Sequence, residues 1–243
     1  MNRMLPCLIL AGGLGTRLRG VLDADMPKAL ASIGGEPFLC WMLRGLLQQG
    51  VTDVVLSLGY GSSQIKDLLK SRHFGMAISF IEEDEPLGTG GAIVHAMKTY
   101  GAPDMIVMNG DTLSNLDLRK LSEFYHSRRP DLVVAATQVH DASRYGTLDF
   151  DATSRRLSAF REKRPAQGFI NAGTYAINAR KLLSFDLPAK FSFEQEFLSE
   201  QVSTLDIRVF PQVTEFIDIG IPTDYVRAQT IIPLMLEPRA SEA

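Results

Sequence analysis

Short apolar runs alternate with helix-like segments as far as about residue 140. The runs have the length of buried strands and lie at residues 5–10, 53–58, 76–81, 104–108 and 131–137. Between them, two segments repeat apolar residues at the spacing of one helix face. The first contains Phe38, Leu39, Met42, Leu43, Leu46 and Leu47 and should end at Gly50, and the second contains Leu118, Leu121, Phe124 and Tyr125. The alternation predicts an α/β fold, with a mainly parallel sheet flanked by helices.

The pattern changes after about residue 140. Residues 145–151, 155–162 and 168–178 resemble strands of a mixed or antiparallel region, and residues 193–201 resemble a helix. No linker rich in Pro, Gly or Ser separates the two parts. We therefore expect residues 1–243 to form a single domain with two halves, about 1–140 and about 141–235.

Composition narrows the range of partners. The chain has 25 basic and 28 acidic residues, a net charge of −3, so nothing suggests binding to nucleic acid. Its two cysteines, Cys7 and Cys40, lie in apolar runs and suit a reducing compartment. The apolar start faintly resembles a signal peptide but is better explained as a buried strand, and no later run has the length of a membrane span. We expect a cytoplasmic protein without membrane contact.

A glycine-rich loop follows the first predicted strand. Gly12, Gly13 and Gly15 let phosphate oxygens approach backbone N–H groups, and Arg17 and Lys28 add cations. Two common phosphate motifs do not fit. A dinucleotide fingerprint needs glycine where Leu18 stands, and no Gly-Lys-Ser/Thr follows as in a P-loop. The alternative is a tight structural turn.

Two carboxylates are candidates for a metal site. Asp111 follows the strand at 104–108, at an edge of the sheet where ligands commonly bind. Asp218 stands among apolar residues, and its alternative role is to cap a helix that starts near Pro222 or to close a turn. Carboxylates of this kind suit Mg²⁺, which takes one or two of them together with substrate phosphates. The acidic run at residues 82–85 is interpreted as a solvated loop.

The full string of motifs resembles the sugar-1-phosphate nucleotidylyltransferases. The match rests on residues 12–18 (GGLGTRL), 27–28 (PK) and 36–37 (EP), and it extends from Leu8 to about Tyr225. The resemblance implies a Rossmann-like sheet of the nucleotide-diphospho-sugar transferase type, with a nucleoside triphosphate and a sugar 1-phosphate as substrates. Residues 19–21 read Arg-Gly-Val, where many members of the family carry a proline.

The same resemblance assigns roles to residues. It implies that the first half of the domain binds the nucleotide through Leu10, Ala11, Gly12, Gly13, Gly15, Thr16, Arg17, Gly88 and Thr89. It implies that the second half binds the sugar phosphate through Gly146, Glu162, Lys163, Asn171 and Gly173. Asp111 and Asp218 would hold one Mg²⁺. Taken alone, Glu162-Lys163 is typical of a solvated strand end, and Thr89 of a helix cap.

The expected reaction is in-line attack of a sugar-phosphate oxygen on the α-phosphorus, with release of pyrophosphate. The catalytic residues would be Arg17, Lys28, Asp111 and Lys163. Lys163 would orient the attacking phosphate, and Arg17 and Lys28 would stabilise the leaving pyrophosphate. Because the nucleophile is already an anion, charge neutralisation and positioning should supply most of the catalysis.

Segments 85–93, 169–178, 191–197 and 216–225 are most similar to heptose 1-phosphate guanylyltransferases. GTP and D-glycero-D-manno-heptose 1-phosphate are then the expected substrates, and the product would serve surface polysaccharide synthesis. The alternatives are a mannose 1-phosphate guanylyltransferase, a uridylyltransferase for N-acetylmuramate or glucose 1-phosphate, and a thymidylyltransferase. A metal-dependent glycosyltransferase and a non-catalytic nucleotide-sugar-binding subunit are more distant alternatives. A homo-oligomer is compatible with the sequence.

Overall fold

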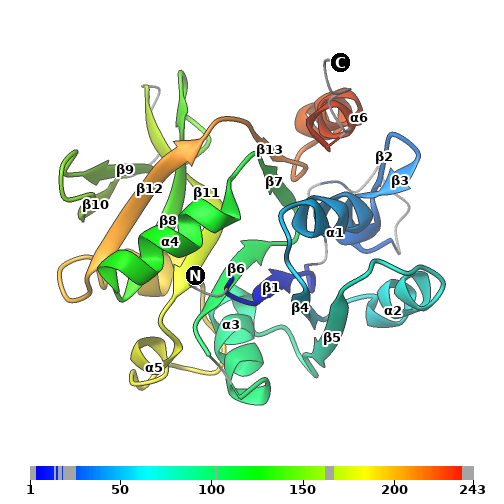
Figure 1. The fold of residues 1–243 in the computed structure, drawn as a ribbon, viewed down its shortest axis with the longest axis horizontal. Helices are drawn as coiled ribbons and strands as arrows, with labels where there is room; N and C mark the ends of the chain where they lie inside the picture. Colours follow the sequence, from blue (N-terminus) through cyan, green and yellow to red (C-terminus); the bar gives the residue numbers. More distant parts are fainter. Residues whose placement is uncertain are drawn as a thin grey trace.

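The computed structural model describes residues 4–13, 15, 18, 26–101, 103–161 and 167–236. Within this part, the first half of the sheet is parallel (Figure 1). Strand β1 (Cys7–Leu10) lies between β4 (Asp53–Leu58) and β6 (Met105–Asn109), and β5 (Ala77–Glu82) extends the sheet beyond β4. Parallel strands place their carboxyl ends at one edge, so the segments after β1, β5 and β6 meet there.

The second half of the chain continues the same sheet with a change of direction. Strand β11 (Gly168–Ile177) runs antiparallel between β6 and β8 (Leu132–Val139), and β12 (Ile207–Val213) runs parallel to β8. A hairpin of β9 (Thr147–Phe150) and β10 (Leu157–Arg161) attaches to β11. The expected mixed, mainly parallel sheet is therefore confirmed.

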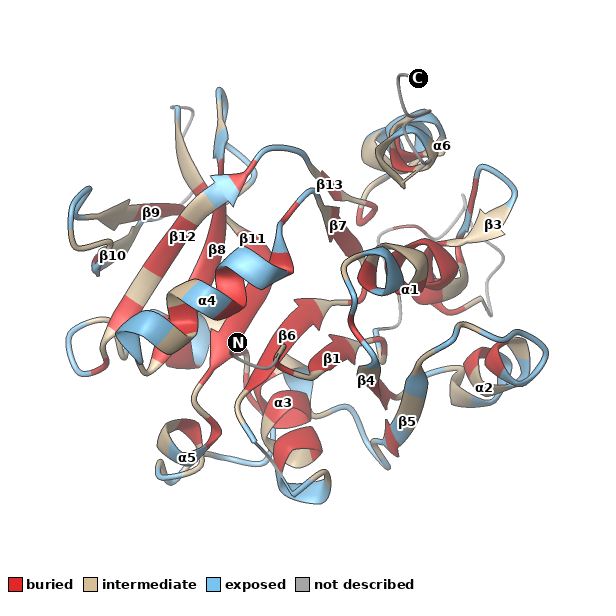
Figure 2. Ribbon diagram, in the orientation of Figure 1, coloured by how far each residue is buried: buried red, intermediate tan, exposed pale blue. Residues whose placement is uncertain are grey.

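Helices cover both faces of the sheet. One face carries α1 (Phe38–Gln48), α2 (Ser62–Lys70), α4 (Leu118–Arg128) and α6 (Pro222–Leu236), and the other carries α3 (Gly88–Thr99), α5 (Ala179–Leu182) and the π-helix η3 (Phe193–Leu198). Side chains along a strand alternate between the two faces. Cys7 and Ile9 of β1 accordingly pack on the α1 side, and Leu8 packs on the α3 side. The buried strands and exposed outer helix faces are visible in Figure 2.

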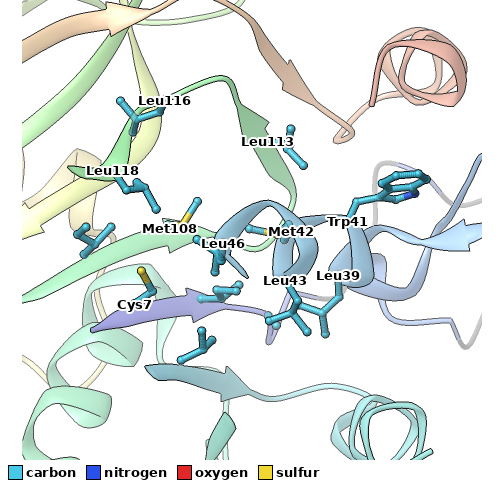
Figure 3. Close-up of a cluster of buried hydrophobic side chains, with 14 of the residues drawn as sticks. Cys7, Leu39, Trp41, Met42, Leu43, Leu46, Met108, Leu113, Leu116 and Leu118 are labelled. Atoms are coloured by element: carbon cyan, nitrogen blue, oxygen red, sulfur yellow. The ribbon is translucent and has the colours of Figure 1, made fainter. Parts of the chain in front are cut away.

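The helix predicted from the apolar spacing before Gly50 is α1, and its apolar face covers β1. Met42 and Leu46 of α1 lie over β1, next to Met108 of the neighbouring strand β6 (Figure 3). The second predicted helical face is that of α4, and the predicted segment at 193–201 is η3. The helical periodicity therefore located these elements because each buries one continuous face.

Three short elements complete the framework of the site. The 3₁₀ turn η2 (Lys28–Leu30) precedes the small hairpin of β2 (Ser32–Ile33) and β3 (Glu36–Pro37). Strand β7 (Thr112–Ser114) follows β6 after a turn and pairs with β13 (Phe216–Asp218) in a separate two-stranded ribbon. This ribbon joins two segments that lie about a hundred residues apart in the chain.

The start of α3 is packed against a segment of residues 189–193. The Gly90 N–H donates to the Phe191 carbonyl at 3.0 Å, and the Phe191 N–H donates to the Leu87 carbonyl at 3.1 Å. A Cβ atom on Gly90 would lie 2.1 Å from the buried Phe191 ring. The glycine in this turn is therefore required by close packing of the chain.

We predict that Gly90→Ala lowers the free energy of unfolding by about 1–3 kcal/mol, because the ring of Phe191 is buried and has no room to retreat. Gly45→Ala is the matched control, since Gly45 also lies inside a helix. Its Cβ would meet only the end of Leu236 at 3.2 Å. The control should change stability by less than about 1 kcal/mol. Urea denaturation of both variants measures the difference, and equal stabilities would contradict the packing argument.

Candidate functional site

The β7–β13 ribbon brings Asp111 and Asp218 together. Asp218 pairs with Thr112, the residue after Asp111, and the Ile219 N–H donates to the Asp111 carbonyl at 3.0 Å. Asp111 itself follows β6 at the edge of the sheet where the carboxyl ends of the strands meet. The two carboxylates thus meet at one point, as the hypothesis of a shared cation requires.

Lys28 lies between the two carboxylates. Its Nζ contacts Asp111 Oδ2 at 2.5 Å and Asp218 Oδ1 at 3.8 Å, and only 8% of its side chain is exposed. We call Lys28, Asp111 and Asp218 the acid–lysine cluster. Gly15 packs on the Lys28 stem, because a Cβ on Gly15 would lie 3.1 Å from the Lys28 Cβ. The lysine predicted to bind phosphate therefore also offsets part of the negative charge of the acid pair.

Each carboxylate has a further donor that fixes its direction. The Thr112 hydroxyl donates to Asp111 Oδ1 at 3.1 Å, and the Gly220 N–H donates to Asp218 Oδ1 at 2.6 Å. The alternative role of Asp218 as a turn-closing residue before α6 is thus compatible with its place in the acid–lysine cluster.

The donor set suits Mg²⁺. Within the described ranges, no group of three or more His, Cys, Asp or Glu residues is placed to hold a metal ion. The protein would therefore contribute two carboxylates and leave the remaining positions to water and substrate phosphates, which is how Mg²⁺ is commonly bound.

A cavity of about 680 Å³ opens beside the acid–lysine cluster. Its lining includes most of the predicted nucleotide-binding residues, namely Leu10, Ala11, Gly12, Gly13, Gly88 and Thr89, together with Lys28 and Asp111. Gly15 contributes through its contact with Lys28, and the predictions on Thr16 and Arg17 lie outside the described residues. The glycine-rich loop and the start of α3 therefore face one space.

The Thr89 side chain does not cap α3. The residue before the helix is Leu87, and no side chain caps α3. The Thr89 hydroxyl instead accepts the Phe193 N–H at 2.9 Å and donates to Glu194 Oε2 at 3.0 Å. The alternative interpretation of Thr89 as a helix cap is therefore wrong, because its hydroxyl is used by the neighbouring π-helix.

Glu83 is a cavity residue that the sequence interpretation missed. Its Oε1 accepts the Ser57 hydroxyl at 3.0 Å, its Oε2 accepts the Leu87 N–H at 3.1 Å, and the residue lines the cavity. Glu82 points outward to Lys66, whose hydrogen bond lowers the Glu82 pKa. The solvated-loop interpretation is therefore wrong for Glu83. Its position just after a parallel strand was the available signal.

Of the residues predicted to bind the sugar phosphate, Gly173 lies against a residue of the cavity wall, and Asn171 is hydrogen-bonded to Gly173. The Asn171 Oδ1 accepts the Gly173 N–H at 2.9 Å, and Gly173 has a φ of +67° at a register shift of β11. A Cβ on Gly173 would lie 2.9 Å from Asn109 Nδ2, and Asn109 lines the cavity. Only glycine fits this close approach in a left-handed conformation.

Of the remaining residues predicted to bind the sugar phosphate, the structure describes Gly146. A Cβ on Gly146 would lie 3.0 Å from the Arg161 carbonyl, so Gly146 borders the chain just before residues 162–163. The predictions on Glu162 and Lys163 lie outside the described residues. Tyr145, next to Gly146, lines a second cavity of about 690 Å³ that also reaches Asp218, and burial raises the Tyr145 pKa. Tyr145 and Asp218 of the acid–lysine cluster therefore line the same cavity.

Comparison with known proteins identifies relatives over nearly the whole chain. The nucleotidyl transferase family matches residues 7–233. A D-glycero-alpha-D-manno-heptose 1-phosphate guanylyltransferase of Aneurinibacillus thermoaerophilus is 40% identical, covering 93% of this chain and 97% of the relative. The enzyme of the same name from Campylobacter jejuni is 38% identical, covering 91% and 97%. The crystal structure of HddC from Yersinia pseudotuberculosis complexed with GMP-PN has a TM-score of 0.81 at 41% identity, covering 93% and 98%.

Among the helices described, none combines the length and the apolar character needed to cross a bilayer.

We predict that Lys28→Met lowers the free energy of unfolding by about 1–2 kcal/mol, because it removes the cation that Asp111 contacts at 2.5 Å. Millimolar Mg²⁺ should restore more stability to this variant than to the wild type, since it can replace the lost charge. Thermal melts with and without Mg²⁺ measure both effects. Lys66→Met, which breaks a more exposed ion pair with Glu82, is the control and should change stability little. A Mg²⁺ effect of the same size in wild type and Lys28→Met would contradict the prediction.

Proposed function

The chain belongs to the nucleotidyl transferase family, and on that premise we propose that it is a guanylyltransferase acting on a heptose 1-phosphate. The substrates would be GTP and D-glycero-D-manno-heptose 1-phosphate, and the products GDP-heptose and pyrophosphate. The two guanylyltransferase relatives support this choice of substrates, since each aligns over nearly its whole length. The product would serve surface polysaccharide synthesis.

The observation that carries the proposal is the acid–lysine cluster beside the cavity. The reaction must bring two anionic substrates together, so their repulsion is the main obstacle. An oxygen of the sugar phosphate forms a bond to the α-phosphorus, and the bond from that phosphorus to the bridging oxygen breaks as pyrophosphate leaves. The nucleophile needs no general base because it is already ionised. Lys28 and the glycine-rich loop supply positive charge and backbone N–H donors next to this point.

Asp111 and Asp218 would hold Mg²⁺, which neutralises phosphate charge when bound. We assign binding of the triphosphate to Leu10, Ala11, Gly12, Gly13, Gly15, Thr16 and Arg17, and binding of the sugar phosphate to Gly146, Glu162, Lys163, Asn171 and Gly173. Arg17 and Lys163 complete the proposed catalytic set with Lys28 and Asp111. Gly88 and Thr89 would lie against the base, since both line the cavity.

Glu83 favours guanine as the base. An ionised carboxylate only accepts hydrogen bonds. Guanine presents two adjacent donors, N1–H and N2–H, whereas uracil and thymine present a single N–H between two acceptors. Ser57 and the Leu87 N–H hold the Glu83 carboxylate in place at the cavity wall. This arrangement supports GTP over UTP and dTTP.

The proposal includes the organisation and location of the protein. The two halves would form one domain, because β11 pairs with β6 of the first half over four residues. Cys7 and Cys40, both described, are free and buried, which supports a cytoplasmic location.

A pyrophosphate-release panel tests the reaction. Purified protein is mixed with GTP, UTP, dTTP, CTP or ATP and with the 1-phosphates of heptose, mannose, glucose and N-acetylmuramate. We expect GTP with heptose 1-phosphate to give the highest kcat/KM, by about tenfold or more over the other pairs. Faster turnover of mannose 1-phosphate or of another nucleotide would show that the proposed substrates are wrong. Nucleotide binding without pyrophosphate release would indicate a non-catalytic subunit.

We predict that Asp111→Asn lowers kcat by about 100-fold or more, because it removes a charge from the proposed metal site while keeping the shape of the side chain. Steady-state kinetics and thermal melts of the variant separate activity from folding. Asp67→Asn, at an exposed carboxylate in α2, is the matched control and should be as active as wild type. A kcat for Asp111→Asn within about twofold of wild type would remove Asp111 from the site.

A further inference from the structure

A chain of polar side chains connects the nucleotide side of the cavity with the sugar side. Thr89 and Tyr175 both donate to Glu194, at 3.0 and 2.9 Å, and Asn171 Nδ2 donates to the Tyr175 hydroxyl oxygen at 2.5 Å. Tyr175 is completely buried and its ring packs edge-to-face on Phe193. The chain links α3, the π-helix η3 and β11, which no backbone ladder joins directly.

The direction of every hydrogen bond in this chain is determined. The Thr89 oxygen accepts the Phe193 N–H, so its proton is free to point at Glu194. The Tyr175 hydroxyl proton points at Glu194 Oε1, because Asn171 Nδ2, the other neighbour of the hydroxyl, is only a donor. The Tyr175 oxygen is then the acceptor for Asn171. Such a network is satisfied in one orientation only.

This arrangement fixes the amide of Asn171. Its Oδ1 accepts the Gly173 N–H, and its Nδ2 donates to Tyr175. A flip of the amide would place an N–H against the Gly173 N–H and would leave the Tyr175 oxygen without a donor. One N–H and one lone pair of the amide stay available for a ligand. Asn171 is therefore held ready to donate and accept on the sugar side.

The location supports a role in substrate binding rather than in packing alone. Asn171 is two residues from Gly173, which is in close contact with Asn109 of the cavity wall. Burial raises the Tyr175 pKa well above its usual value, with further contributions from the charges of Glu194 and Asp111. The hydroxyl therefore stays protonated, and it lies within electrostatic range of the acid–lysine cluster.

We propose that Tyr175, anchored by Glu194, is a positioning residue that acts through Asn171 in recognition of the sugar phosphate. This inference rests on the proposed function, which assigns Asn171 to the sugar side. A π-helix such as η3 frequently marks a functional site, and here it supplies the carboxylate that anchors Tyr175.

Kinetics of Tyr175→Phe test the proposal. The variant keeps the ring and removes only the hydroxyl, so we expect KM for the sugar 1-phosphate to rise about tenfold while kcat and KM for GTP change less than about twofold. The sugar 1-phosphate is the one that wild type uses best in the panel. Unchanged KM for the sugar phosphate, or equal rises in both KM values, would overturn the proposal.

Tyr125→Phe is the matched control. Tyr125 is also a buried tyrosine whose hydroxyl donates to a carboxylate, Asp104, at 2.7 Å, and burial raises its pKa as well. It lies in α4 and lines neither cavity described above. Both variants should lose a similar amount of thermal stability, but Tyr125→Phe should leave both KM values unchanged. A rise of the sugar-phosphate KM in Tyr125→Phe would show a general effect of destabilisation and would overturn the proposal.

A double-mutant cycle with Asn171→Ala separates this proposal from the proposed function. If Tyr175 acts through Asn171, the double variant should have the same KM for the sugar phosphate as Asn171→Ala alone. If the two substitutions raise the KM for the sugar phosphate independently, so that their effects multiply in the double variant, the positioning role would be wrong. The assignment of Asn171 to the sugar phosphate would still hold. An Asn171→Ala enzyme with normal KM would overturn both the sugar-side assignment and the positioning role. Should Tyr175→Phe not fold, Glu194→Gln serves instead, because it removes one of the two acceptors and should raise the same KM.

Discussion

Two negatively charged carboxylates lie close together, and the rest of the structure depends on how their repulsion is offset. Asp111 and Asp218 come from distant parts of the chain, and the β7–β13 ribbon holds them together although their charges repel. Lys28 offsets this repulsion from a nearly buried position, with its stem packed under Gly15. Each of three elements positions part of this cluster: the glycine-rich loop, the 3₁₀ turn and the ribbon. A change in any of them would therefore alter how the charges offset one another.

The nucleotide side and the sugar side are also joined away from this cluster. Residues 189–193 pack on the glycines at the start of α3, and η3 links Thr89 to Tyr175 through one carboxylate. A glycine-rich sequence that resembles a base-binding loop thus serves packing as much as binding. In the proposed reaction, this connection would hold the nucleotide and the sugar phosphate at a fixed separation, as in-line attack requires.

Local periodicity accounts for what the sequence predicted. The apolar faces of α1 and α4 were recognisable because each helix buries one continuous side, and the strands because they are buried on both faces. The antiparallel insertion of β11 between β6 and β8 depends on long-range pairing that no local pattern encodes. The placement of Asp218 was expected only through a family resemblance. Glu83 was missed because it stands in an acidic run, where only the position after β5 distinguishes it from its solvated neighbours.

The charge of the acid–lysine cluster explains how the site can exist both without bound phosphates and with them. The cluster holds two carboxylates and one ammonium, so it carries one excess negative charge and attracts a divalent cation. With a divalent cation held by Asp111 and Asp218, the cluster would carry a net positive charge that attracts phosphates. Without Lys28 the two carboxylates and a divalent cation would only cancel, and the site would lack the positive charge that brings two phosphate-bearing molecules together. The proposed chemistry would thus depend on the lysine between the acids as much as on the acids themselves.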